Sequence, residues 1–263
     1  MVHGKSFAAL VAGCCLALGL SAPARSIDLP QTILSAACTV PENDVATAGS
    51  LSQLGTKLRS GQPIKIMAIG SSSTFGIGAS SRVHTYPSDL RPLMTAALKN
   101  TKITVVNRGV SGEVAATTAQ RIRDEVEVER PDLLLWQLGT NDALSRVPPD
   151  EFASTVNTTL DWLQENHIEV ALIGLQYTSK LARDANYISI RDVLFKIAKD
   201  RHILYIRRYA AMQFIARTRR NEHLLSADQF HLNDLGYECM AEQVAHAVVA
   251  SLFVKRFRPA GHK

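Results

Sequence analysis

The chain has 263 residues, of which 46% are hydrophobic and 20% charged. This composition supplies enough apolar material for a globular core and excludes an intrinsically disordered protein. The formal net charge of +5 is small for a chain of this length, so we expect no nucleic-acid partner. The body of the chain contains no uninterrupted apolar run as long as a membrane span, which argues against an integral membrane protein.

The first 24 residues have the pattern of a secretory signal peptide. Lys5 gives a basic tip, residues 6–20 form an apolar stretch, and Ala22-Pro23-Ala24 is the predicted cleavage signal. We therefore expect an exported protein, periplasmic or secreted, with no membrane span after cleavage. The alternatives are a retained anchor or buried N-terminal helix, and a lipoprotein acylated at Cys14, although the apolar run continues past Cys14.

Residues 25–62 are predicted to form an N-terminal extension that carries one helix. A turn is expected at 41–44, and the helix runs through Leu51, Leu54 and Leu58.

Two cysteines, Cys38 and Cys239, remain once the signal peptide is removed. In an exported protein these two cysteines could form a disulfide that ties the extension to the last predicted helix. Two buried free thiols are the alternative. The sequence gives no indication of the oligomeric state.

Residues 63–255 alternate between apolar runs of strand length and amphipathic stretches of helix length, and residues 256–263 form a short tail. The runs are mostly apolar on both faces, which is typical of buried parallel strands. The predicted strands are Ile64–Ile69, Ile103–Asn107, Leu133–Leu138, Glu169–Leu175 and Ile203–Ile206. The predicted helices are 86–99, 113–129, 150–166, 185–200 and 234–254. This alternation predicts an α/β fold with a five-stranded parallel sheet, in which ligands bind at the carboxyl ends of the strands.

A cluster of serines follows the first predicted strand, in the sequence Gly70-Ser-Ser-Ser-Thr-Phe-Gly76. A hydroxyl beside backbone N–H groups at a strand-to-helix turn is a candidate nucleophile. A polar helix cap or a phosphate-binding loop would use similar residues. The chain, however, lacks the Gly-Lys-Ser/Thr ending of a P-loop and the dinucleotide-binding fingerprint.

Two further turns, Asn107–Gly112 and Gly139–Asp142, follow the second and third predicted strands. A backbone N–H in the first turn and the Asn141 amide in the second could point to the same edge of the sheet as the serines. Together with a serine they would form an oxyanion hole, which stabilises the tetrahedral intermediate of acyl transfer.

Asp228 and His231 are three residues apart, just before the last predicted helix. This spacing lets a carboxylate hold an imidazole in the tautomer that a general base requires. A solvated loop or a helix cap would give the same pair. The chain has no His-Glu-x-x-His motif and no paired Cys/His spacing, so we predict no metal and no cofactor.

The ordered set of serine, glycine, asparagine and Asp-x-x-His resembles the SGNH hydrolases, also called GDSL-type esterases, over about residues 64–252. The resemblance implies a three-layer α/β/α sandwich similar to flavodoxin. It also implies Ser72 as nucleophile, His231 as base and Asp228 as the residue that orients the base. The implied oxyanion hole consists of the N–H groups of Ser72 and Gly112 and the side chain of Asn141. No Gly-x-Ser-x-Gly motif is present, which argues against an α/β-hydrolase.

One residue departs from the family pattern, because Gly70 is followed by Ser71 where relatives usually have Asp. Without this Asp, the loop could be less rigid and the reaction slower, although the chemistry would be the same. It also leaves three adjacent serines, Ser71, Ser72 and Ser73, as candidates for the nucleophile. The family pattern favours Ser72.

The expected function is an exported serine esterase that hydrolyses short acyl or O-acetyl groups on a small ester, a glycan or a lipid. The alternatives are a catalytically weak or inactive module that binds carbohydrate or cell envelope, and an O-acyltransferase of the same fold. Gln176 and Tyr177, at the end of the fourth predicted strand, are candidates for the substrate pocket from their position alone.

Overall fold

Six strands form one sheet in the order β1-β6-β5-β4-β2-β3. The computed structural model describes Met1, residues 33–99 and residues 101–253, and the six strands and the helices of the fold lie in these ranges. The predicted signal peptide (1–24), the alternative acylation site Cys14 and the tail (256–263) lie outside them. Neighbouring strands from β6 to β3 are parallel, whereas β1 pairs antiparallel with β6. The strands are β1 (Ala46–Thr47), β2 (Ile64–Gly70), β3 (Ile103–Gly109), β4 (Leu133–Gln137), β5 (Glu169–Ile173) and β6 (Leu204–Ile206).

The prediction of a five-stranded sheet is wrong by one strand. All five predicted strands are present, and the additional strand, β1, comes from the N-terminal extension. Sequence periodicity cannot reveal β1, because two residues are too few to show an alternating pattern. The residues predicted as a turn at 41–44 belong largely to a short helix, α1 (Glu42–Val45). With α2 (Ser52–Arg59), the extension thus contributes two helices and a strand instead of the single helix expected.

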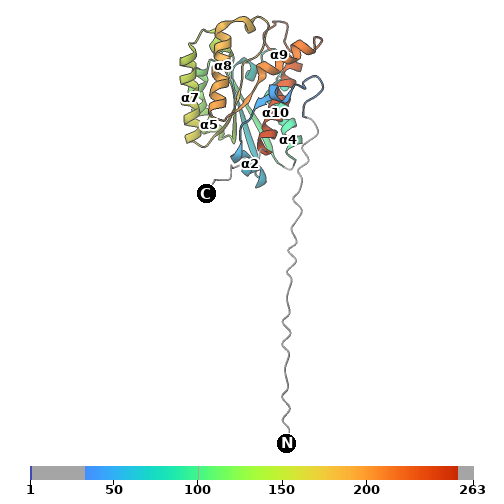
Figure 1. Ribbon diagram of the computed structural model, residues 1–263, viewed down its shortest axis with the longest axis vertical. Helices are drawn as coiled ribbons and strands as arrows, with labels where there is room; N and C mark the ends of the chain where they lie inside the picture. Colours follow the sequence, from blue (N-terminus) through green and yellow to red (C-terminus); the bar gives the residue numbers. More distant parts are fainter. Residues whose placement is uncertain (2–32, 100, 254–263) are drawn as a thin grey trace. The chain divides into compact units, whose positions relative to one another are not determined.

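Helices cover both faces of the sheet, as predicted for a three-layer α/β/α sandwich. One layer contains α5 (Ala115–Glu129), α7 (Pro149–Glu165) and α8 (Ala185–Asp200), and the other contains α4 (Tyr86–Ala97), α9 (Arg208–Thr218) and α10 (Asp234–Phe253) (Figure 1). Side chains of β2 alternate between the two layers. Ile66 and Ala68 join the core with α4 and α10, whereas Met67 and Ile69 join the core with α5, α7 and α8. Helix α9 was not predicted.

Short elements occupy the connections after the strands. They are α3 (Ser72–Phe75), α6 (Thr140–Leu144) and the 3₁₀ turns Arg82–His84 and Leu181–Arg183. In the described ranges, the helices are too short or too polar to cross a membrane.

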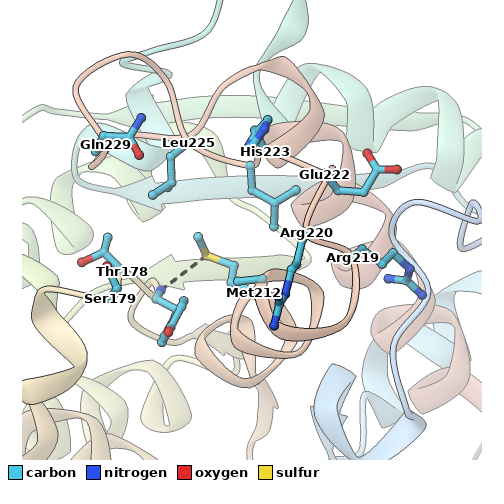
Figure 2. Close-up of a pocket in the computed structure, with 12 residues that line it drawn as sticks. Thr178, Ser179, Met212, Arg219, Arg220, Glu222, His223, Leu225 and Gln229 are labelled. Carbon is cyan, nitrogen blue, oxygen red and sulfur yellow. Dashed lines mark hydrogen bonds between the residues drawn. The ribbon is translucent and has the colours of Figure 1, made fainter.

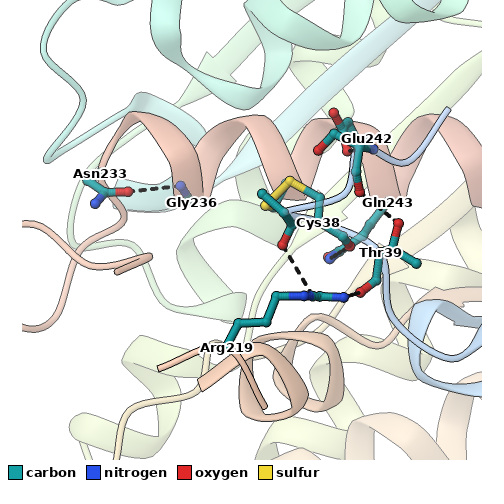
Figure 3. The surroundings of a disulfide bond; sticks show 10 residues. Cys38, Thr39, Arg219, Asn233, Gly236, Glu242 and Gln243 are labelled. Atoms are coloured by element: carbon teal, nitrogen blue, oxygen red, sulfur yellow. Dashed lines mark hydrogen bonds between the residues drawn. A yellow bond between two sulfur atoms is a disulfide. The ribbon is translucent and has the colours of Figure 1, made fainter. Parts of the chain in front are cut away.

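A disulfide joins Cys38 in the N-terminal segment to Cys239 in α10 (Figure 3). Of the two alternatives expected for these cysteines, the structure therefore contains the bridge. Both residues are buried. The same segment is also held by hydrogen bonds, because the N–H of Ser35 donates to Glu242 at 2.7 Å and Arg219 donates to two of its backbone carbonyls. The extension thus packs on the sheet domain as an integral part of it.

Candidate active site

The serine turn lies at the carboxyl end of β2, and Ser72 is the first residue of α3. The Oε1 atom of Gln137, the last residue of β4, organises this turn. It accepts hydrogen bonds from the Ser71 N–H at 3.1 Å, the Ser71 hydroxyl at 3.2 Å and the Thr74 hydroxyl at 3.2 Å. Gly70 is required at the preceding position, because a Cβ there would lie 2.4 Å from the Gln137 carbonyl oxygen. The departure at Ser71 therefore leaves the turn tied to β4 through a buried amide.

Asp228 and His231 are in contact, with 2.6 Å between Asp228 Oδ2 and His231 Nδ1. The other carboxylate oxygen of Asp228 accepts from the N–H groups of Phe230 and His231, both at 2.9 Å, and from the Ser226 hydroxyl at 2.8 Å. Desolvation raises the pKa of Asp228, but the hydrogen bonds from these groups outweigh it and hold the pKa well below its usual range. An ionised Asp228 favours the tautomer of His231 that carries its proton on Nδ1 and leaves Nε2 free to accept one.

The serine turn packs directly against the loop that carries His231. A Cβ placed on Gly78, just after the turn, would lie 3.0 Å from His231 Cβ. Gln176 joins the two segments, because its Nε2 donates to the Phe230 carbonyl at 2.9 Å and its Oε1 accepts from the Ser73 hydroxyl at 3.5 Å. The structure thus brings the predicted nucleophile turn and the predicted Asp-His pair to one place.

The predicted oxyanion donors lie on the adjoining turns after β3 and β4. Gly112 has a φ of +87°, which glycine adopts readily and other residues rarely do. The Asn141 side chain donates one N–H to the Glu113 carbonyl at 2.8 Å, which leaves its second N–H for a ligand. Among the described residues, the N–H groups of Ser72 and Gly112 have no acceptor. Three donors are therefore available at this rim.

Asp142, next to Asn141, fixes the two oxyanion turns relative to each other. Its carboxylate accepts from the Ala115 N–H at 2.8 Å and from the Gly139 N–H at 3.2 Å. The side chain is buried, and burial raises the pKa of Asp142 against the opposing effect of these backbone bonds. The carboxylate thus connects the β3–α5 loop, which contains Gly112, to the turn that contains Asn141.

Gln176 and Tyr177, the candidates for the substrate pocket, lie in different environments. Tyr177 lines a pocket of about 320 Å³ between the segment after β5, helix α9 and the loop before Asp228. Figure 2 shows Gln229 and Arg220 in its wall, with Met212 at its base accepting from the Tyr177 N–H. Gln176 is buried, donates to the loop that carries His231 and does not line this pocket.

Sequence patterns missed several polar residues that support the site, including Gln137, Asp142, Ser226 and Arg208. Gln137 is a buried polar residue at the end of an otherwise apolar strand, and that contrast is a signal the sequence does carry. Arg208 gives no such signal, because it follows Arg207 at the start of a helix that was not predicted. Within the described ranges, no three His, Cys, Asp or Glu side chains are grouped as a metal site would require.

Comparisons with known proteins bear on the family and the fold of the chain. The Non-GDSL lipase-like family matches residues 37–253. An arylesterase from Vibrio mimicus is 26% identical over 74 residues, a match that covers 28% of this chain and only 37% of the relative's length.

Among solved structures, a two-domain esterase active on acetylated mannans has a TM-score of 0.67 at 16% identity, covering 86% of this chain and 61% of that one. A variant of Axe2, an acetyl xylan esterase from Geobacillus stearothermophilus, has a TM-score of 0.61 at 20% identity, covering 76% of this chain and 100% of that one. At these identities, the structural likeness shows the fold.

The family match covers the sheet domain and most of the described N-terminal segment, and it includes every predicted site residue. It confirms the resemblance to the SGNH/GDSL-type hydrolases. The chain belongs to the Non-GDSL lipase-like family.

Proposed function

We propose that the protein is an exported serine esterase that removes short acyl or O-acetyl groups from an alcohol, with Ser72 as nucleophile. The observation that carries the proposal is the 2.6 Å contact between Asp228 and His231 on a loop packed against the serine turn. A hydroxyl, an imidazole and an ionised carboxylate in this order are the groups that acyl transfer through serine requires.

In the proposed reaction, the Ser72 hydroxyl oxygen attacks the ester carbonyl carbon while His231 Nε2 takes the hydroxyl proton. The carbonyl oxygen becomes an oxyanion that accepts from the N–H groups of Ser72 and Gly112 and from the Asn141 amide. Collapse of this intermediate breaks the bond to the alcohol oxygen, which leaves with the proton from His231. Water then attacks the acyl-enzyme, with His231 again as base, and releases the acid and free Ser72.

The negative charge of Asp228 supports the assignment of His231 as the base. Ionised Asp228 stabilises the imidazolium that forms when His231 accepts the proton. Because the pKa of Asp228 is held low by hydrogen bonds, this carboxylate stays charged throughout the neutral pH range.

We assign the pocket beside Tyr177 to the substrate. Gln229, which belongs to the loop that carries Asp228 and His231, lines this pocket. Its wall also carries the side chains of Arg220, Glu222 and His223 (Figure 2). This charged and polar lining suits a hydroxyl-rich alcohol, such as a sugar, better than a long hydrocarbon chain. The esterases active on acetylated mannans and acetylated xylan share the fold, which makes O-acetylated glycans the first substrates to test.

Export is supported by the signal-peptide pattern of residues 1–24 and by the disulfide between Cys38 and Cys239. Disulfides form and persist in the periplasm and outside the cell, and they are rare in the cytosol.

The test compares wild type with Ser72→Ala on p-nitrophenyl esters of increasing chain length and on acetylated xylan and mannan. Wild type should turn over the acetyl ester fastest, and Ser72→Ala should lose several orders of magnitude in kcat. Labelling by a fluorophosphonate should occur at Ser72. Equal turnover by the two proteins would refute Ser72 as nucleophile. No labelling of the folded wild type would favour a binding module, and acetyl transfer to added sugars in preference to water would favour an acyltransferase.

A further inference from the structure

Arg208 is a buried arginine without a carboxylate partner, and it lies directly behind the serine turn. It is the first residue of α9 and is 1% exposed. Its Nη2 donates to the Ser73 hydroxyl at 3.0 Å and to Gln176 Oε1 at 2.9 Å. Within residues 33–99 and 101–253, it forms no salt bridge, and its Nε and Nη1 atoms have no hydrogen-bond acceptor.

This arrangement is unfavourable for stability. Burying a guanidinium removes its hydration, and an uncompensated charge in the interior costs more than the neutral groups it displaces. The positive end of the α9 dipole also disfavours a cation at the first helical residue. Burial lowers the pKa of Arg208, as expected for a charge that is hard to accommodate. The folded structure alone thus gives no reason for an arginine at this position.

The phenols around Arg208 do not supply the missing negative charge. Tyr86, Tyr187 and Tyr237 surround the guanidinium closely enough for their charges to interact with it. Burial raises the pKa of all three phenols, and that of Tyr237 reaches about 12, so they are neutral at physiological pH. The guanidinium charge therefore remains uncompensated next to the site.

The contacts of Arg208 join the two halves of the proposed active site. Ser73 follows Ser72 directly, so the bond to its hydroxyl restrains the nucleophile turn. The side chain of Gln176 donates to the Phe230 carbonyl in the loop of His231, and the backbone carbonyl of Gln176 accepts from the Tyr187 hydroxyl at 2.6 Å. Arg208 therefore fixes a short chain of contacts from the turn of Ser72 to the loop of His231.

We propose that Arg208 is a positioning residue for the ester hydrolysis, which uses its charged donor group to hold Ser73 and Gln176 and thereby sets Ser72 against His231. This inference rests on the proposed function and assigns Arg208 a role beyond those of the predicted triad and oxyanion hole. Since Arg208 acts through its neighbours and touches no substrate, its loss should slow the chemical step and leave substrate binding nearly unchanged.

The test compares wild type with Arg208→Met, which keeps a long apolar side chain and removes the charge. We expect kcat per labelled active site to fall about 10- to 100-fold, because small misplacements of reacting groups have effects of this size. KM should stay within about threefold of wild type, since the interaction lost is not one with the bound ester. The Tm should stay within about 3 °C of wild type or rise, because an uncompensated buried charge is removed.

Two further variants separate positioning from simple damage. Arg208→Lys keeps the charge and a donor but lacks the fork of the guanidinium, so its kcat should exceed that of Arg208→Met by about threefold or more. Arg207→Met is the matched control. It removes the same charge from the adjacent residue, which is partly exposed and whose Nη1 lies 3.7 Å from Asp44 Oδ1, and it should leave kcat unchanged.

The proposal is overturned if Arg208→Met keeps kcat per labelled site within about twofold of wild type, or if only KM changes. It is also overturned if Arg208→Lys is no better than Arg208→Met, or if the loss of activity matches a loss of folded protein. Wild type is measured in the same assays. A wild type that is neither labelled at Ser72 nor active on esters would refute the proposed function itself, whereas an active wild type with an equally active Arg208→Met refutes only this inference.

Discussion

Breaking the disulfide between Cys38 and Cys239 should lower the free energy of unfolding without dismantling the native structure. The two cysteines are 201 residues apart in the chain, so the bridge closes a very long loop in the unfolded state. The chain-entropy relation gives about 5 kcal/mol for a loop of this length, and native bridges usually contribute somewhat less, so we expect a loss of about 3–5 kcal/mol. For a protein of this size, that loss lowers the Tm by roughly 10 °C.

The native state should survive because non-covalent contacts also hold the N-terminal segment. The Ser35 N–H donates to Glu242, and Val45, Leu51 and Leu54 are buried in the core. The bridge therefore acts mainly on the unfolded chain, whose freedom increases when it is broken.

The assay is denaturant unfolding of residues 25–263 with and without a reductant, together with the double variant Cys38→Ala/Cys239→Ala. The oxidised protein should show no free thiol after denaturation, and reduction should shift its unfolding midpoint. The double variant should unfold at the lower midpoint and should not respond to reductant. A change in the free energy of unfolding below about 1 kcal/mol on reduction, or two free thiols in the purified protein, would refute this reasoning.

Two further predictions concern the turn that carries Asn141 and a half-buried carboxylate. Asn141→Ala should lower kcat by about 100- to 1000-fold, the usual loss for one oxyanion donor, and a loss below tenfold contradicts the role of Asn141. The control is Asn157→Ala, at a partly buried position on α7, which should leave kcat nearly unchanged. Desolvation by burial, with Glu238 and Asp234 nearby and His84 opposing, raises the pKa of Asp89 to about 6. The folded state thus binds the proton of Asp89 more tightly than the unfolded state, and stability falls as pH rises through that value. Because the Asp89 carboxyl is ionised at about pH 8, Asp89→Asn should raise the Tm there by about 2–4 °C, after allowance for solvent screening. At about pH 4, where the carboxyl is protonated, the substitution should leave the Tm unchanged. An equal gain at both pH values in thermal melts would show that ionisation of Asp89 is not the cause.

The parallel part of the sheet could be predicted because its strands are buried on both faces. Runs such as 64–69 and 133–138, which are apolar at all but one position, indicate buried strands in a chain with alternating helical stretches. Strand β1 and helix α9 could not be predicted in this way, each for its own reason. The first has only two residues, and the second follows β6 after Arg207 alone, with no Gly or Pro to mark a boundary.

In the candidate site, contacts between residues close in the chain could be predicted, whereas contacts between distant residues could not. Asp228 and His231 could be paired from the sequence because three residues on one loop bring their side chains together. The bond from Ser71 to Gln137 spans 66 residues, and that from Arg208 to Ser73 spans 135. Periodicity and spacing report only on neighbours in the chain, so contacts at these separations appear only once the strands are placed in order.

The order of the strands also explains why the site needs support from residues that do not touch a substrate. The turns carrying Ser72, Gly112 and Asn141 follow β2, β3 and β4, which are hydrogen-bonded neighbours, so the sheet itself fixes them relative to one another. The loop carrying His231 precedes α10 and does not follow any strand of the sheet. Its position relative to Ser72 therefore depends on contacts made by side chains, among them those of Gln176. Loss of such contacts should slow the proposed reaction without unfolding the protein.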